Sequence, residues 1–248
     1  MATRQVLAEL CADHTARSGV RVVIESVGGV DAARRVQAGE AFDLVVLGSD
    51  AIDRLIASGH LQAGSRTDIV RSGVAACVPA GAAMPDLSTE AGLRQALNAA
   101  ARIGFSTGPS GVALQKLFQR WGLDQAMAAK TVQAPPGVPV ASLVAQGAIS
   151  LGFQQLSELL GVPGIAIVPG WPASIPIVTT FSAGVPVGTP HADAVQALLV
   201  WLTSPVRRTE IGPSNRVRVG IVRPLSMRNT RSRKSWAISS LGRAGGST

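Results

Sequence analysis

The sequence predicts an α/β protein of two lobes joined by two long strands. Short apolar runs alternate with segments in which apolar residues recur at helical spacing, as in proteins whose strands and helices take turns. Two extended segments, 68–79 and 175–187, stand apart from this alternation, and each is long enough to cross between lobes. The chain has 248 residues, more than the roughly 100 to 200 of one ordinary domain.

The first elements are predicted from spacing and turn residues. Residues 3–18 place Leu7, Leu10 and Cys11 at helical spacing, and Gly19 ends this helix. A β-branched run over 20–27 predicts a strand, and two glycines after it predict a turn. The next expected elements are a helix over 30–37, a strand over 42–47 and a helix over 50–58.

The middle of the chain continues the alternation. The expected strands are 103–105, 131–133 and 149–153. The expected helices are 89–101, 112–121, 140–146, 155–160 and 192–202. This order predicts mainly parallel strands with right-handed crossovers. If the two long segments cross between lobes, lobe I comprises residues 1–72 and 180–206, and lobe II comprises residues 73–179.

The formal net charge of +8 is concentrated at one end of the chain. Residues 1–206 hold 13 Lys and Arg against 14 Asp and Glu, whereas residues 207–248 hold 10 against 1. The body therefore gives no reason to expect specific nucleic-acid binding. The composition of 207–248 is typical of a disordered basic tail, and equally of a frame-shifted, non-native reading of GC-rich DNA.

Cysteine content, hydropathy and the first residues indicate in which compartment the chain resides. Cys11 and Cys77 are too few for a disulfide framework and are not spaced as metal ligands, so both are expected to be buried. No run approaches the roughly 20 apolar residues that a membrane-spanning helix needs. The first residues do not read as a secretory signal, so the chain as written is expected to stay in the cytoplasm.

The most informative feature is the hexapeptide STGPSG at residues 106–111, which joins a predicted strand to a predicted helix. A helix start offers free N–H groups and the positive end of the helix dipole, and three hydroxyls are added here, which is typical of an anion site. Ser49 lies in a similar turn after the strand at 42–47. Capping alone explains the shorter turn, but the hexapeptide is richer than a cap requires.

Catalytic patterns are incomplete. Residues 108–112 resemble a nucleophile elbow without its final Gly, and no His or acid is positioned for Ser110. His14, His60 and His191 are dispersed and are expected to be structural or surface residues. Glu158 is expected to be solvated. Because the glycine-rich phosphate motifs are also incomplete, no catalytic residue, metal site or cofactor is predicted.

Three segments resemble the molybdate-type substrate-binding proteins of ABC transporters: 39–49, 103–114 and 144–153. The resemblance implies a type 2 periplasmic-binding-protein fold, with the solute held between the lobes by hydroxyls and backbone N–H groups. The chain departs from the family pattern because it starts inside the first helix, without the strand and Ser-bearing loop that precede it. It also has Phe153 and Gln154 where the family places a Tyr, and it contains no Tyr.

The resemblance predicts a monomeric binding protein that captures a small anion, an organic carboxylate or a molybdate-like oxyanion, for the permease of an ABC importer. It implies a periplasmic location. A small-carboxylate isomerase on the same fold and a cytoplasmic small-molecule sensor are the alternatives. The predicted ligand-binding residues are Ser49, Ser106, Thr107, Ser110, Gly111 and Gln154.

The glutamines that follow the strand at 149–153 bear on the choice of ligand. Gln154 and Gln155 offer amides that both donate and accept hydrogen bonds. Such groups suit an organic acid better than a bare oxyanion, and a small carboxylate is the expected ligand. Strand alternation equally allows that Phe153 is a core residue and that both glutamines face solvent.

Overall fold

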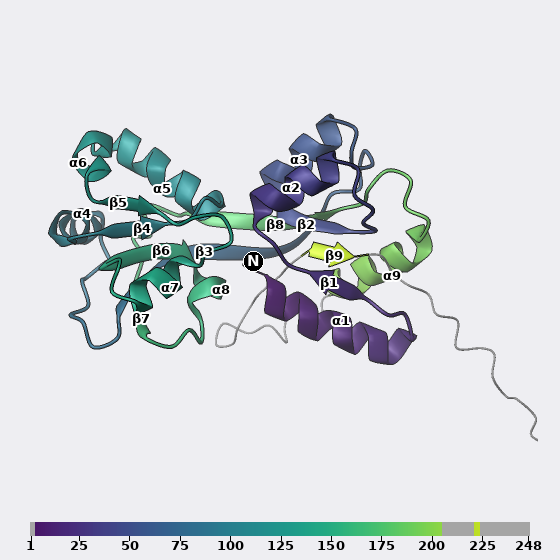
Figure 1. Ribbon diagram of the computed structural model, residues 1–248, viewed down its shortest axis with the longest axis horizontal. Coiled ribbons are helices and arrows are strands. Elements are labelled where there is room, and N and C mark those ends of the chain that lie inside the picture. The colour runs from purple at the N-terminus through teal and green to yellow at the C-terminus, as the bar shows by residue number, and fades with distance from the viewer. Residues whose placement is uncertain (1–2, 205–220, 224–248) are drawn as a thin grey trace, which may run out of the picture.

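The computed structural model describes residues 3–204 and 221–223. They form two lobes that lie side by side, and strands β3 (Thr67–Pro79) and β8 (Val178–Gly184) run from one lobe into the other (Figure 1). Lobe I contains α1, β1, α2, β2, α3 and α9, and lobe II contains the elements that lie between β3 and β8 in the sequence. The predicted architecture of two α/β lobes joined by two crossing strands is confirmed.

Lobe I begins with α1 (Arg4–Ser18), which ends where Gly19 adopts a φ of 72°. This left-handed conformation strains residues with a Cβ but not glycine. The elements that follow are β1 (Val23–Glu25), α2 (Gly29–Gln37), β2 (Val45–Gly48), α3 (Ser49–Ala57) and, after β8, α9 (Ala192–Thr203). Each lies within a few residues of its predicted position.

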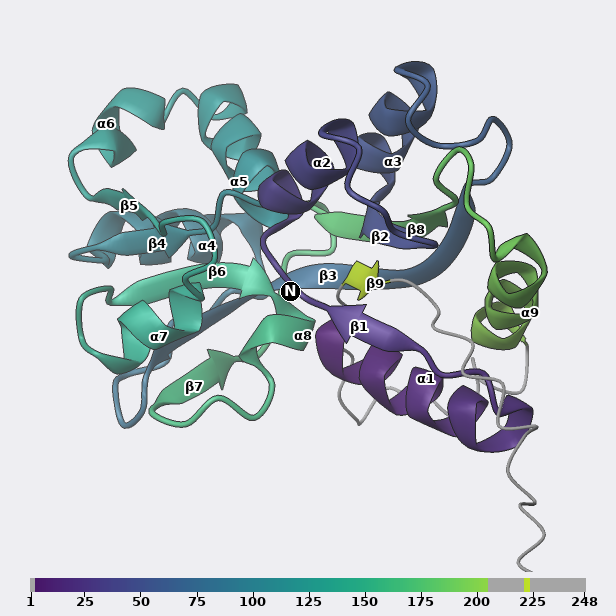
Figure 2. The same cartoon turned by 45° about the vertical axis from the view of Figure 1, so that its right-hand side comes forward.

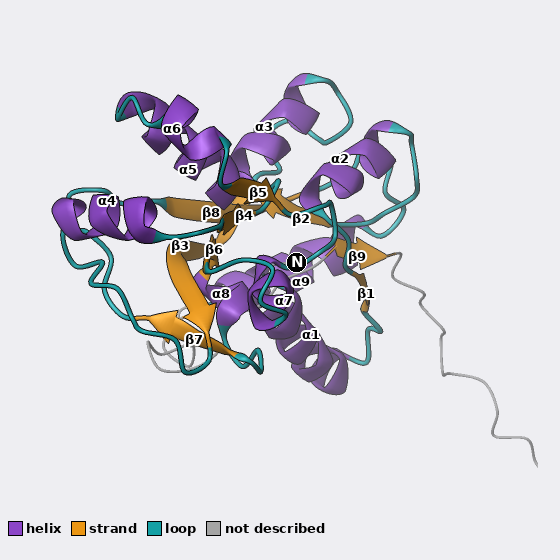
Figure 3. Ribbon diagram, turned by 60° about the vertical axis from the view of Figure 1, so that its left-hand side comes forward, coloured by secondary structure: helices purple, strands orange, loops and turns teal. Residues whose placement is uncertain are grey.

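Residues 44–47 divide the core of lobe I into two layers. Leu44 and Val46 pack with apolar residues of α1 and α9, whereas Val45 and Leu47 pack with those of α2 and α3. Successive side chains of a strand point to opposite faces, so a continuous apolar run is what a sheet covered by helices on both sides requires. Figure 3 shows α2 and α3 on one side of β2 and α1 on the other.

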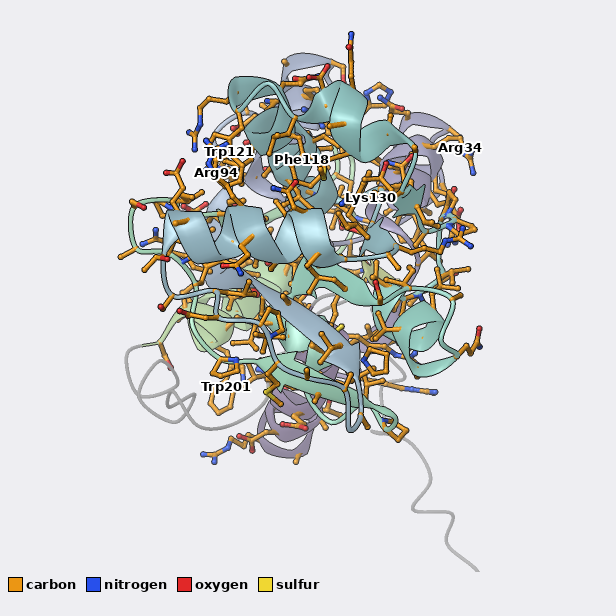
Figure 4. The ribbon with its side chains drawn as sticks, turned by 90° about the vertical axis from the view of Figure 1, so that its left-hand side faces the viewer. Arg34, Arg94, Phe118, Trp121, Lys130 and Trp201 are labelled. Carbon is orange, nitrogen blue, oxygen red and sulfur yellow. The ribbon has the colours of Figure 1, made fainter. Side chains whose placement is uncertain are left out.

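Lobe II is one continuous segment of the chain. Its elements are α4 (Glu90–Ala99), β4 (Ile103–Phe105), α5 (Pro109–Arg120), α6 (Asp124–Ala128), β5 (Thr131–Gln133), α7 (Val140–Ala145), β6 (Leu151–Gln155), α8 (Leu156–Leu159) and β7 (Ile165–Val168). The sequence reading missed α6 and β7. Arg94 of α4 lies over the ring of Trp121 at the end of α5, 4.0 Å from its centre, and this contact ties the two helices together (Figure 4).

The main sheet has the strand order β2-β8-β3-β6-β4-β5, and β7 also pairs with β3. In this sheet only β4 pairs in parallel, with β5 and β6, so the prediction of mainly parallel strands is wrong for the described residues. Strand β3 pairs with β8 up to Gly73 and with β6 from Val74 onward. This change of partner lies beside the boundary placed between residues 72 and 73, which stays a prediction.

Part of the basic C-terminal segment is structured. Residues 221–223 form β9 (Ile221–Arg223), which pairs antiparallel with β1. The interpretation of 207–248 as a disordered or non-native tail stays a prediction, because the rest of that segment lies outside the described residues. Among the helices that the structure describes, none is both long and apolar enough to cross a bilayer.

Candidate functional site

A cavity of about 850 Å³ lies between the two lobes. Lobe I contributes one side of α2, the turn from β2 into α3, and part of α3. Lobe II contributes the turn before α5, one side of α5, the loop before α7 and the end of β6, and residues 177–181 in and before β8 also line it. Helices α2 and α5 approach each other across the gap between the lobes (Figure 2).

The hexapeptide at residues 106–111, called the anion loop from here on, lines this cavity through Ser106, Thr107 and Ser110. The Oγ of Ser106 accepts a hydrogen bond from the N–H of Gly108 at 3.2 Å and lies 3.3 Å from the Oγ of Ser110. Ser110 is buried, with 2% of its surface exposed. Since α5 has 12 residues, its first N–H groups and its dipole add to these hydroxyls.

Gly111 is predicted to bind the ligand, and the structure shows that it also has a steric role in the loop. It is buried and is not among the residues that line the cavity. A Cβ added to it would lie 1.8 Å from the carbonyl oxygen of Ser106. Gly111 therefore allows the anion loop to fold back onto the first turn of α5, which positions the hydroxyls of Ser106 and Ser110.

The turn at Ser49 and the turn before α5 line the same cavity. Ser49 begins α3 and lines the cavity, with its Oγ 3.4 Å from an Asp50 carboxylate oxygen. A Cβ added to Gly48 would lie 3.2 Å from Pro109 at the start of α5. The Ser49 turn of lobe I and the anion loop of lobe II thus face the same space.

Both glutamines at the end of β6 are buried, each with 2% exposure, and both line the cavity. The solvent-facing alternative for them is wrong, whereas Phe153 is a core residue packed edge-on against Trp171. The amide oxygen of Gln154 accepts a bond from the N–H of Ala141 at 3.3 Å.

Gln155 is the less satisfied of the two. Its Nε2 donates to the hydroxyl of Thr179 at 2.6 Å, and its buried Oε1 has no hydrogen-bond partner in the described structure. A hydroxyl both donates and accepts, so rotation of the amide by half a turn would keep the bond to Thr179 and turn the nitrogen outward instead. Gln155 can thus offer a ligand either an acceptor or a donor.

Glu158 lies in the first turn of α8 and lines the cavity, so the expectation that it is solvated is wrong. Burial raises the pKa of its carboxyl group, and hydrogen bonds from the Gln154 side chain and the Gln155 backbone oppose that rise. Gln155 caps the helix and Glu158 is its third residue, so the backbone bond is one half of a capping box. The carboxyl group is held in place by two neighbours.

Charged side chains from both lobes line the cavity: Arg34, Arg54, Lys116, Asp50 and Glu158. Arg34 is paired with Asp31 on the same helix, and Arg54 and Lys116 are exposed on α3 and α5. Three cations against two carboxylates leave a net positive wall on which a ligand with several negative charges would be favoured.

The three histidines lie outside the cavity lining. His14 is buried and packs against Trp201, and its pKa is lowered by burial. His191 Nδ1 lies 2.9 Å from a carboxylate oxygen of Asp43. The described ranges contain no group of three or more His, Cys, Asp or Glu side chains able to hold a metal ion.

A sequence profile described as bacterial extracellular solute-binding protein matches residues 1–211. The chain belongs to this family. Among solved structures, this family member resembles the periplasmic molybdate-binding protein of Azotobacter vinelandii, with 22% identity, a TM-score of 0.66, and coverage of 81% of this chain and 88% of that one.

A second structural likeness is to the substrate-binding domain of a putative molybdenum ABC transporter from Clostridium difficile, with 16% identity, a TM-score of 0.64, and coverage of 90% and 95%. At such identities the two likenesses show the fold, which is the type 2 periplasmic-binding fold that the sequence predicts.

A closer sequence likeness is to an aconitate isomerase from a Pseudomonas species. The two chains are 39% identical over 171 residues, which are 68% of this chain. This solute-binding family member spans 65% of the length of that isomerase.

Sequence reasoning did not select Gln155, Glu158 or the three basic residues as ligand-binding residues. The sequence does indicate Gln155, because it is a polar residue that follows the predicted strand at 149–153. No sequence pattern indicates Arg34, Arg54 or Lys116 as ligand-binding residues, since isolated Arg and Lys on helices are ordinarily solvated.

Proposed function

We propose that the chain captures a small organic acid with more than one carboxylate group in the cleft between its lobes. The observation that carries this proposal is the charge of the cavity wall. Arg34 and Arg54 on lobe I face a space shared with Lys116 and the anion loop on lobe II. Cations at separate points on the two lobes favour a ligand whose negative charges also lie at separate points.

The size of the cavity supports an organic ligand. Its volume of about 850 Å³ falls within the roughly 300 to 1,000 Å³ typical of pockets for small organic molecules and cofactors. A single tetrahedral oxyanion would leave most of that space to water. The buried Oε1 of Gln155 has no partner in the described structure, and a ligand that pairs with this amide would remove a cost of about 1 to 3 kcal/mol.

The anion loop would bind one carboxylate of such a ligand. The hydroxyls of Ser106 and Ser110 and the first N–H groups of α5 are uncharged donors, and charge-assisted hydrogen bonds from them to a carboxylate are stronger than neutral ones. Ser49 on the facing turn supplies a further donor. Gln154, whose amide oxygen is already bonded to Ala141, is proposed to support Gln155 and Glu158.

Thermal unfolding in the presence of candidate ligands tests the proposal. Tricarballylate, citrate, succinate, molybdate, tungstate and sulfate are compared at equal concentration. Only binding to the native state stabilises it, by about 2.7 kcal/mol when the ligand is at one hundred times its Kd. For a protein of this size that corresponds to a rise in Tm of roughly 5 to 11 °C.

The paired variants Arg54→Gln and Arg120→Gln make the comparison specific. Both residues lie on exposed helical positions, but only Arg54 lines the cavity. The first variant is expected to reduce the rise in Tm caused by a tricarboxylate, and the second to leave it unchanged. A larger rise with molybdate or tungstate than with any carboxylate would contradict the proposal.

Membership of the solute-binding family favours capture for an ABC importer, with the lobes closing on the ligand outside the inner membrane. The permease is then the partner, and the protein is proposed to act as a monomer.

Isomerisation of a small tricarboxylate is the second candidate function. It is favoured by the 39% identity to a protein named aconitate isomerase, which exceeds the identity to either molybdenum-related structure. Capture and isomerisation require the same binding cleft, so the ligand comparison above bears on both.

A further inference from the structure

We infer that Glu158 is a catalytic residue that moves a proton from one carbon to another on an unsaturated tricarboxylate held in the cleft. The inference rests on the proposed function, because it requires a bound polycarboxylate. Glu158 thereby takes a chemical step that no local sequence pattern indicates.

The position of Glu158 is the first support. It lines the cavity from the lobe II side, in the short helix that follows the buried glutamines of β6. Its carboxyl group pairs with no Arg, Lys or His side chain of the described residues.

The orientation of Glu158 is the second support. The Gln154 side chain and the Gln155 backbone N–H both donate to its carboxyl group. Two donors from one strand end restrict the rotamers of this side chain, as a proton-transferring group requires. Burial also raises the pKa of this carboxyl group, which makes its ionised form a better base than an exposed glutamate.

Other cavity residues do not fit the step equally well. Asp50 is exposed at the start of α3. Arg34, Arg54 and Lys116 are cationic at neutral pH and suit charge stabilisation instead. The histidines do not line the cavity. Glu158 is therefore the cavity-lining group that combines burial, fixed orientation and basicity.

The step is a shift of one proton along three carbon atoms. A Glu158 carboxylate oxygen takes a proton from the methylene carbon next to the carbon–carbon double bond, and the electron pair spreads over the three carbons and the attached carboxylates. The same oxygen returns the proton to the carbon at the other end. One C–H bond breaks, another forms, and the double bond moves along the chain, so no oxidant or reductant is required.

The surrounding charges stabilise the intermediate. Negative charge increases on the ligand carboxylates when the proton leaves, and donors fixed in advance around such charge stabilise the transition state. The cavity-lining cations on α2, α3 and α5 and the N-terminus of α5 are placed for this. When the double bond has moved, a cis tricarboxylate can be released as the trans isomer.

The test compares Glu158→Gln with the wild-type chain, using cis-aconitate as substrate and tricarballylate as a saturated analogue that cannot be isomerised. Gln at this position can still accept the backbone N–H of the capping box but cannot accept a proton from carbon. Glu90→Gln is the matched control, because Glu90 pairs with Arg94 on α4 and does not line the cavity.

We expect the wild-type chain and Glu90→Gln to convert cis-aconitate to the trans isomer, followed by proton NMR, and to incorporate solvent deuterium into the ligand. Glu158→Gln should lose about 100-fold to 10,000-fold in rate, the range for general acid–base catalysis. Its calorimetric affinity for tricarballylate should equal or exceed that of the wild type, since a negative charge has been removed.

The other outcomes separate the two claims. Unchanged isomerisation in Glu158→Gln would overturn the assignment to this residue. Tight binding of tricarballylate without isomerisation or deuterium incorporation by the wild type would overturn the catalytic step while the binding function stands. If no polycarboxylate binds to the wild type, the proposed function itself fails.

Discussion

Gly111→Ala tests whether the anion loop depends on the close approach of its own backbone. The added Cβ would lie 1.8 Å from the carbonyl oxygen of Ser106 and 2.8 Å from its carbonyl carbon. Ordinary contacts of a Cβ are 3.4 Å or longer, so the loop or the first turn of α5 must move by more than 1 Å. The partner is backbone and cannot rotate away as a side chain would.

The expected cost follows from that movement. Overpacking of a buried site destabilises proteins by about 1 to 3 kcal/mol, which corresponds to a fall in Tm of roughly 2 to 12 °C at this chain length. A displacement near 1 Å also separates the Ser106 and Ser110 hydroxyls from a ligand carboxylate. Carboxylate affinity should therefore fall further than the loss of stability alone would explain.

The measurements are urea unfolding and calorimetry with tricarballylate. Gly73→Ala is the control, because a Cβ on Gly73 would meet no atom within 4 Å and its φ is not in the left-handed region. The reasoning is refuted if Gly111→Ala matches the wild type within about 0.5 kcal/mol, the usual range for neutral surface changes.

Two further outcomes are expected. Ser110→Ala should weaken carboxylate binding by about 1 to 3 kcal/mol in calorimetry with little change in Tm, because it leaves a ligand oxygen unpaired; unchanged affinity would reduce the loop to a helix cap. The pKa of Asp68 is held below its usual value, first by the Ser182 hydroxyl and then by Arg66. Its ionised form stabilises the fold above the unfolded pKa of about 4, and this contribution is lost as pH falls through the folded pKa. Asp68→Asn should therefore lose less stability than the wild type as the pH falls below about 4 in urea titrations.

The parts of the fold that sequence could predict are those set by local pattern. The strand at Ile103–Phe105 and helix α5 follow from an apolar run, a turn rich in Ser and Gly, and helical spacing after it. Strand pairing could not be predicted in this way. β3 runs antiparallel to three different strands, and such contacts between distant segments leave no local pattern.

The site was predicted in outline for the same reason. Hydroxyls before α5 are a local signal, and they do line the cavity. The burial of Gln154 and Gln155 was not predictable from alternation, because all five residues of β6 are buried and alternation fails where both faces of a sheet are covered. Glu158 lies in a helix that the sequence does predict, but which side of that helix faces the cavity depends on contacts with distant segments.

The two lobes differ in when their chain segments become available during synthesis. Lobe II is one uninterrupted segment, but the core of lobe I joins Leu7 and Cys11 of α1 to Leu198 and Leu199 of α9. Each doubling of a closed loop costs only about 0.6 kcal/mol, so this separation has little effect on final stability. It does set the order of events, since domains generally fold as units while the chain emerges. Lobe II can fold on the ribosome, while the core around α1 stays incomplete until α9 has been translated.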